Sequence, residues 1–426
     1  MGLYKILSLI IVLCAAFSYI NHRFIKWPPT IGIMVLSLLT SVLLVVSSNF
    51  FPTIHYYAVS LIGSIDFYTL LMKMMLSFLL FAGGFHLNAH RLAQQKWPIL
   101  TLATIGILIS SFLVGGAFYF LFSLFGISIP FIICLLFGSL ISPTDPIAVL
   151  AILKRAGIPE SLELKIAGES LFNDGVAVVL FTSIMDVALS SSGDIVVSSV
   201  AWLFIKEAFG GALLGAALGY VGYLVLRTID DYKVETLMTV AIVMGGYLFA
   251  DYLHISGPIA MVIAGIITGN TGKQLKVDHA RNYLGHFWSL IDEILNAVLF
   301  LLIGFEMLVI NKNPVIIVIG AIGIVIVLAA RFTSVAIPVS ILKRRLKFEP
   351  HAITLLSWGG LRGGLSVAMA LSLPIDMYRD IFVTITYVIV VFSIIVQGLT
   401  IGKLGKLAIP KETTEPGDTA PAPNPL

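Results

Sequence analysis

Four acid or amide side chains interrupt an otherwise apolar stretch of the chain. They are Asp145, Glu169, Asn173 and Asp174. An ionisable side chain at the centre of a membrane-spanning helix costs at least ~2.5–3.5 kcal/mol on insertion scales, so such residues mark functional sites by default. Carboxylate oxygens can hold either a proton or a hard cation. The stretch therefore predicts ion chemistry inside a membrane.

The first carboxylate lies in a proline-flanked run, Ser142-Pro143-Thr144-Asp145-Pro146. Each proline lacks a backbone N–H and disfavours helix at the residue before it. The run therefore predicts a helix break, which frees carbonyl groups to bind a cation and creates a new helix N-terminus that stabilises the Asp145 anion. Unsatisfied backbone at this depth is tolerated only beside a water-filled cavity or inside the protein. A simple proline kink is the alternative interpretation.

The second group of polar residues has the spacing of two helix faces. If the stretch is helical, Ser170 and Asp174 share one face, and Glu169 and Asn173 share another. The first face can hold a cation with a hydroxyl and a carboxylate. The buried Glu169 needs a partner, and the intramembrane Arg331 can supply it through its bidentate guanidinium. The alternative is that Arg331 caps backbone carbonyls.

The composition requires a membrane around these residues. Hydrophobic residues make up 58% of the 426 and charged residues 12%, whereas a soluble domain carries about 25% charged residues. The mean hydropathy is +1.01. No water-soluble fold can bury so much apolar surface, so we predict an all-α polytopic membrane protein. The two cysteines lie in apolar runs and indicate neither a disulfide framework nor a metal site.

Thirteen apolar runs are long enough to cross a hydrocarbon core of ~30 Å, if some are partly extended or re-entrant. They form a membrane domain over 1–408, and the polar, proline-rich stretch over 409–426 predicts a disordered cytoplasmic tail. Runs 235–253 and 255–270 could instead form one bent hairpin. The runs are 3–20, 30–48, 69–85, 98–122, 129–152, 164–188, 198–227, 235–253, 255–270, 289–310, 314–342, 351–373 and 380–402.

The basic residues support this count. With the N-terminus outside, the cytoplasmic loops and C-terminus hold 19 of the 26 lysines and arginines, and the outer loops hold five. The positive-inside rule demands such a split, and a wrong count would scramble it. We therefore expect a multi-pass protein of the cell (plasma or inner) membrane with a cytoplasmic C-terminus. The remaining two basic residues, Arg331 and Arg362, fall within spans.

The two halves of the chain resemble each other. The run LLFAGGFHL over 79–87 returns as FLLIGFEML over 300–308, and each half has one span interrupted by glycine or proline, over 141–150 and 358–370. Inverted repeats with broken helices are typical of transporters whose site lies where the breaks meet. We predict two inverted six-helix repeats with discontinuous helices, over about 1–188 and 235–408, linked by a helix over 198–227.

Three motifs together resemble one family. TDP at 144–146, ESLFND at 169–174 and GGLRGG at 359–364 are similar to the NhaP/NHE branch of the monovalent cation:proton antiporters. The resemblance covers about residues 1–408. It implies exchange of sodium or lithium for protons, a thirteen-helix fold with crossed unwound helices in a six-helix core, and a homodimer. The chain departs from the animal exchangers in lacking a long cytoplasmic tail, so regulation by such a tail is not implied.

The resemblance also assigns roles to residues. The order Asn173-Asp174 resembles the electroneutral members, which exchange one cation for one proton, whereas electrogenic relatives carry two aspartates there. Arg331 would pair with Glu169. The cation and proton site, including the ligands of the transported sodium, would consist of Asp145, Asp174, Ser170, Thr144 through its backbone carbonyl and the neighbouring Glu169, with Asn173, Arg331 and Arg362 in support.

Other intramembrane charges are harder to assign. Arg362 either satisfies carbonyls where the surrounding glycines loosen the helix, or acts directly in transport or the response to pH. Asp292 and Glu293 begin an apolar run, where an acid favours a helix N-terminus, so we interpret them as a cap or funnel rather than as ligands.

These residues predict a mechanism of competition. Asp174 and Asp145 can hold a dehydrated cation or a proton, and two arrangements that expose them alternately would exchange the ions. No G-x-x-x-x-G-K-[ST] motif is present, so an ion gradient should drive transport. We expect no enzymatic activity, no cofactor, and no nucleic-acid partner, only membrane lipid and a second copy. A potassium/proton antiporter is the nearest alternative, and a cation channel without strict coupling is a more distant one.

Overall fold

Every regular element in the described part of the chain is a helix, and no strand occurs there. The predicted all-α class is therefore confirmed. The predicted tail over 409–426 lies outside the described residues. The computed structural model describes residues 3–63, 69–189, 197–229, 231–271, 278–308, 310, 313–346 and 348–406.

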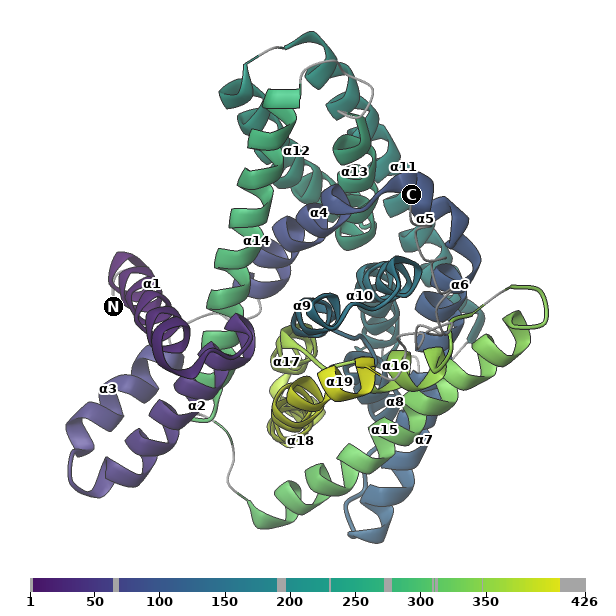
Figure 1. The fold of residues 1–426 in the computed structure, drawn as a ribbon. Helices are drawn as coiled ribbons and strands as arrows, with labels where there is room; N and C mark the ends of the chain where they lie inside the picture. Colours follow the sequence, from purple (N-terminus) through teal and green to yellow (C-terminus); the bar gives the residue numbers. More distant parts are fainter. Residues whose placement is uncertain are drawn as a thin grey trace, which may run out of the picture.

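The helices follow the apolar runs closely (Figure 1). The elements are α1 (Leu3–Ile20), α2 (Pro29–Val46), α3 (Pro52–Gly63), α4 (Leu76–His86), α5 (Ala89–Gln94), α6 (Lys96–Thr101), α7 (Ile107–Leu124), α8 (Phe131–Ile141), α9 (Ile147–Ala156), α10 (Glu160–Leu189), α11 (Val197–Thr228), α12 (Tyr232–Tyr252), α13 (Gly257–Thr271), α14 (Asp278–Glu306), α15 (Pro314–Leu342), α16 (Ala352–Trp358), α17 (Gly364–Leu371), α18 (Arg379–Phe392) and α19 (Gly398–Gly405). Short 3-10 or π turns are η1 (Asn21–Ile25), η2 (Ser47–Asn49), η3 (Thr69–Met75), η4 (Leu102–Gly106), η5 (Ile375–Met377) and η6 (Ser393–Gln397).

Within the described residues, ten continuous helical segments are long and apolar enough to cross a membrane. They coincide with ten of the predicted runs. Of the other three, one is the separate helix α13, and two are spans interrupted between α8 and α9 and between α16 and α17. The pair that might have been one hairpin thus forms two helices, α12 and α13, joined by a short turn. Helix α3 was not predicted because its twelve residues are too short for a span.

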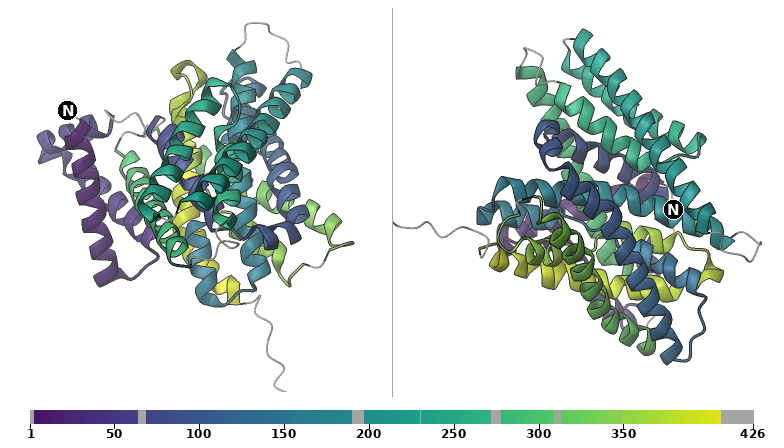
Figure 2. Two further views of the ribbon diagram at one scale, coloured as in Figure 1. Left: turned by 90° about the horizontal axis from the view of Figure 1, so that it is seen from above. Right: turned by 90° about the vertical axis from the view of Figure 1, so that its right-hand side faces the viewer.

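Two groups of helices pack side by side. In one, α4 lies against α13 and α14, while α11 and α12 lie against α13 and α2 lies against α14. In the other, α7 packs on α8 and α15, and α18 packs on α15 and α17. Helix α10 packs on α8 and also contacts α11 and α13, so it joins the two groups. The purple N-terminal helices lie at one edge of the molecule (Figure 2, left).

Glycines bring α4 and α13 together. A Cβ atom at Gly265 or Gly269 would meet the backbone of Phe81 or Phe85. Small residues let helix backbones approach closely inside a membrane, where apolar contact alone does not drive association. The first group of helices is therefore held by direct backbone contact.

The two interrupted helices cross. The backbone N–H of Asp145, between α8 and α9, donates a hydrogen bond of 2.8 Å to the carbonyl of Leu361, between α16 and α17. Gly363 permits the crossing, because a Cβ there would lie 2.6 Å from the Cβ of Asp145. Both predicted breaks are present, and they meet at one place. The inverted symmetry of the segments 1–188 and 235–408 stays a prediction.

Candidate cation-binding site

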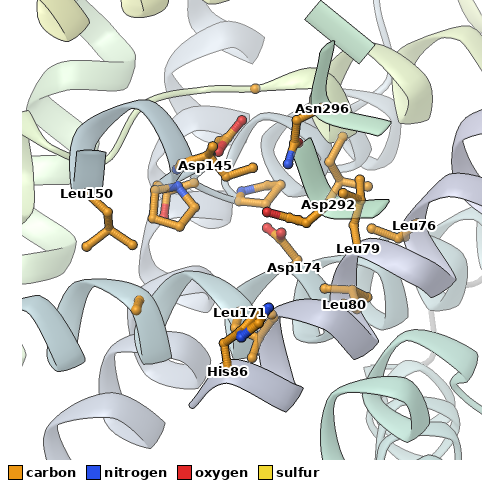
Figure 3. A pocket seen from close by; sticks show the side chains of 18 of the residues that line it. Leu76, Leu79, Leu80, His86, Asp145, Leu150, Leu171, Asp174, Asp292 and Asn296 are labelled. Atoms are coloured by element: carbon orange, nitrogen blue, oxygen red, sulfur yellow. The ribbon is translucent and has the colours of Figure 1, made fainter. Parts of the chain in front are cut away.

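A cavity of about 500 Å³ lies between the two groups of helices. Its walls come from α4 and α14 on one side and from α9, α10 and α17 on the other. The cavity reaches exposed charged residues that include Arg91, Lys154 and Glu160, so it opens to the surface there. Inside, three half-buried carboxylates line it: Asp145, Asp174 and Asp292 (Figure 3).

Asp145 lies in the break of the first interrupted helix. Its Oδ1 atom accepts a hydrogen bond of 3.0 Å from the backbone N–H of Ile147, the first residue of α9. A helix N-terminus carries partial positive charge and unpaired N–H groups, which stabilise an anion. The break that Pro143 and Pro146 predict thus places a carboxylate at a new helix end, facing the cavity. The simple proline kink is excluded, because residues 142–146 separate two distinct helices.

Arg362, in the other break, satisfies the carbonyls that the first break frees. Its Nη1 atom donates to the carbonyl of Ser142 at 2.5 Å and to that of Pro143 at 3.0 Å. The side chain is 2% exposed. Its backbone N–H donates to the hydroxyl of Ser393 at 2.9 Å. The structure displays one of the two roles predicted for Arg362, the binding of backbone carbonyls. These carbonyls belong to the break between α8 and α9, not to the segment of Arg362 itself.

Helix α10 contributes a buried polar face next to the first break. The side-chain amide of Asn173 donates to the hydroxyl of Thr144 at 2.7 Å, and its oxygen accepts from the backbone N–H of Thr144 at 3.4 Å. Ser170 donates its hydroxyl proton to the carbonyl of Thr144. The predicted ligands Ser170 and Thr144 therefore lie together, and the Ser170 hydroxyl bonds to the Thr144 carbonyl.

Asp174 is placed differently from these neighbours. It lines the cavity with Ala167 and Leu171, while Ser170, 2% exposed, does not. Within the described residues Asp174 makes no hydrogen bond or ion pair. A carboxylate that faces a cavity without a protein partner is free to hold a proton or a cation.

Glu169 is committed to a partner away from the cavity. Its Oε1 atom lies 2.6 Å from Nη1 of Arg331, and both side chains are almost fully buried. Arg331 also donates from Nη2 to the carbonyl of Leu356 at 2.9 Å. Gly360 makes room for the guanidinium, since a Cβ there would lie 2.5 Å from Nε. Arg331 thus does both things that the sequence suggested, pairing with Glu169 and capping a carbonyl.

A second buried ion pair was missed from the sequence. Lys165, counted among loop residues, lies inside α10 and is 1% exposed. Its Nζ lies 2.7 Å from Oε2 of Glu349, in the loop before α16, and 4.9 Å from the ring centre of Phe348. Partial burial raises the pKa of Glu349, but hydrogen bonds from Lys165 and Ser161 outweigh it and hold the pKa below the usual 4.5.

Of the two roles predicted for Asp292, cap or funnel, the cap is wrong, and Asn296 was not singled out from the sequence. Helix α14 begins at Asp278, so Asp292 lies in the middle of it and is not an N-terminal cap. Both residues line the cavity, as a funnel residue would. The signal in the sequence was their spacing: an acid and an amide four residues apart on one face of an apolar helix. Among the described residues, no three histidine, cysteine, aspartate or glutamate side chains form a metal-binding cluster.

Comparison with known proteins identifies relatives of the whole chain. The family model described as "Sodium/hydrogen exchanger, transmembrane" matches residues 9–407. The Na(+)/H(+) antiporter NhaP of Pseudomonas aeruginosa is 46% identical over 401 residues, which cover 92% of this chain and 94% of that protein. NhaH of Halobacillus dabanensis, also a Na(+)/H(+) antiporter, is 38% identical over 345 residues, covering 80% and 83%.

The fold also has a solved counterpart. The structure of the sodium proton antiporter MjNhaP1 from Methanocaldococcus jannaschii at pH 8 superposes with a TM-score of 0.73. The match covers 96% of this chain and 99% of that one at 19% identity, so it supports the fold alone.

Proposed function

The chain belongs to the sodium/hydrogen exchanger family, and we therefore propose that it is a secondary antiporter that exchanges sodium, or lithium, for protons across a membrane. The observation that carries the proposal is the cavity that ends at Asp174, a carboxylate with no partner among the described residues, beside Asp145 at a helix end. The relatives' names favour sodium over potassium and an exchanger over a channel.

The mechanism rests on competition for the oxygens of Asp174. A cation that loses its water shell needs several oxygen ligands. Asp145 lines the cavity with Asp174, Ser170 lies one turn before Asp174 on α10, and the Thr144 carbonyl contacts Ser170, so these groups are the candidates to complete the shell. For the carbonyl to bind a cation, the Ser170 hydroxyl must turn away from it. A proton on Asp174 neutralises the same charge. Occupation by one ion therefore disfavours the other, which couples the two fluxes.

Three groups hold the site in shape without binding the cargo. Asn173 fixes Thr144 through its amide. Arg362 occupies the carbonyls of Ser142 and Pro143, so these are not available to a cation. Arg331 neutralises Glu169. We propose that Glu169 is a structural anchor between α10 and α15 rather than a ligand, since it does not line the cavity.

The charged residues at the mouth of the cavity support a proposal for the side of the membrane to which the cavity opens. Arg91 and Lys154 lie in segments that the positive-inside rule places in the cytoplasm, and both line the cavity. We propose that this conformation is open to the cytoplasm, that the N-terminus is outside, and that the C-terminus is cytoplasmic. A homodimer in the cell membrane and one-for-one, electroneutral exchange complete the proposal.

A vesicle assay tests the function directly. Inside-out vesicles or proteoliposomes are given an inward proton gradient, followed by a dye that reports its size, and sodium, lithium and potassium are added in turn. We expect sodium and lithium to dissipate the gradient and potassium to have little effect. Asp174→Asn should be inserted in normal amounts and give no response. If no cation dissipates the gradient in the wild type, the proposal is wrong; a response to potassium alone would make the chain a potassium/proton antiporter.

A further inference from the structure

The cavity has an acidic group that the exchange mechanism above does not use. Asp292 and Asn296 project from α14, on the wall opposite α10 (Figure 3). In that view the carboxylates of Asp292 and Asp174 point toward each other across the cavity. Asp292 forms no ion pair with any described residue, so none of the described basic side chains neutralises it. The next acid along, Glu293, is exposed.

Asn296 makes this more than an isolated acid. Its side chain is 2% exposed, and its amide group interacts with the Asp292 carboxylate. Its oxygen accepts no hydrogen bond from any described residue, and a buried acceptor without a partner carries an uncompensated desolvation penalty. A cation bound by the amide oxygen would remove part of that penalty.

The two residues have the geometry of a weak oxygen site. Residues four apart on a helix share one face. Leu299, three residues after Asn296, continues the same cavity wall. One carboxylate and one amide oxygen are suitable ligands for a hard monovalent cation that keeps part of its water shell. Two protein ligands are too few to hold the ion tightly, as is appropriate for a site that the ion occupies only transiently.

The position in the fold separates this pair from the exchange site. Helix α14 packs on α1, α2 and α4, whereas Asp174 lies on α10, which joins the two groups, and Asp145 lies between α8 and α9. We propose that Asp292 and Asn296 form a capture site for the partly hydrated cation on the α14 wall, from which it passes to Asp174 on the facing wall. This inference rests on the proposed antiport function and adds a second, separate binding step to it.

The test measures apparent affinity and maximal rate separately. Wild type, Asp292→Asn, Asp292→Glu and the matched control Glu293→Gln, which removes an exposed charge one residue away, are reconstituted and assayed over a sodium series at fixed pH. We expect Asp292→Asn to raise the apparent KM for sodium roughly tenfold, equivalent to about 1.4 kcal/mol, with the maximal rate within about twofold. Asp292→Glu should recover most of the affinity, and Glu293→Gln should match the wild type.

A second measurement does not depend on turnover. In purified Asp174→Asn, which cannot exchange, sodium should still raise the melting temperature in a saturable way at high concentration, and adding Asp292→Asn should abolish that effect. An unchanged KM in Asp292→Asn, or a lower maximal rate with the KM unchanged, overturns the capture site while the antiport function stands. Failure of the function itself has a different appearance, since the wild type would then exchange no cation.

Discussion

The buried pair between Glu169 and Arg331 gives the sharpest test of how charge is held in this membrane domain. The two side chains are 2% and 6% exposed, and 2.6 Å separates the paired atoms. Removing one partner of a buried pair leaves an uncompensated charge and typically costs ~3–5 kcal/mol. Replacing both by apolar groups of similar size is often close to neutral. The pair therefore predicts a strongly non-additive set of variants.

The contacts of each partner refine the expectation. In Glu169→Leu the guanidinium keeps one bond, from Nη2 to the carbonyl of Leu356. In Arg331→Met the carboxylate of Glu169 loses its one partner among the described residues, and the Leu356 carbonyl loses the Arg331 donor. We expect each single variant to be destabilised by ~3–5 kcal/mol and the double variant by less than either, so that the coupling free energy is roughly 3 kcal/mol or more.

Thermal unfolding of the purified protein in detergent measures this cycle through the melting temperature. The matched control is Arg379→Met, which breaks a surface pair with Asp380 whose N–O distance is 4.0 Å and whose side chains are 35% and 69% exposed. Exposed pairs contribute about 0–1 kcal/mol, so this variant should melt close to the wild type. If the effects of Glu169→Leu and Arg331→Met simply added in the double variant, the pair would not be what holds α10 to α15.

Four further outcomes are expected. The apparent sodium affinity of the wild type should weaken as pH falls, and Asp174→Asn should abolish exchange at every pH; residual exchange in that variant would move the carrier elsewhere. Gly363→Ala should lower the exchange rate at least tenfold, because the new methyl group meets Asp145. The control Gly245→Ala has open space around its Cβ and should have no effect. Equal exchange rates in the two variants would refute the close crossing. The pKa of Glu349 is lowered in the folded protein. The wild type should therefore melt at a higher temperature than Glu349→Gln, with the full difference above pH 4.5 and none once the pH has fallen through the folded pKa. A difference that grows in acid would contradict the pairing. Solid-supported membrane recordings should detect no steady current, and exchange should ignore an imposed potential.

Features set by local chemistry could be predicted from the sequence. Pro143 and Pro146 each remove a backbone donor and disfavour helix at the residue before them, so an interruption of the helix here could be predicted without knowledge of its surroundings. The pairing of Glu169 with Arg331 could be predicted because Arg331 lies deep within a predicted span and its guanidinium can bind a carboxylate through two donors. That the two breaks would meet came from the resemblance and from the similarity of the two halves.

Features set by distant neighbours could not. Arg362 binds the carbonyl of Ser142, which lies 220 residues away, and its glycine-rich surroundings were equally compatible with bonds inside its own segment. Asp292 was assigned to a helix start because residues 278–288 are polar enough to resemble a loop, yet they continue α14. Lys165 was counted among the cytoplasmic basic residues because it lies at the very start of the predicted run 164–188, and its partner Glu349 lies 184 residues away. In each case the sequence shows a charge but not what faces it.

The number of charges that move with the cargo decides whether exchange is electroneutral. The Ile147 N–H and the N-terminus of α9 stabilise the Asp145 anion, whichever ion is bound to Asp174. The residue before Asp174 is Asn173, which is neutral and occupied with Thr144, so it adds no charge. Asp292 belongs to the other group of helices and need not travel with the site. We therefore predict that one carboxylate, Asp174, alternates between a cation and a proton. The two halves of the cycle then carry the same total charge, so no net charge moves per cycle and an imposed potential should not drive exchange.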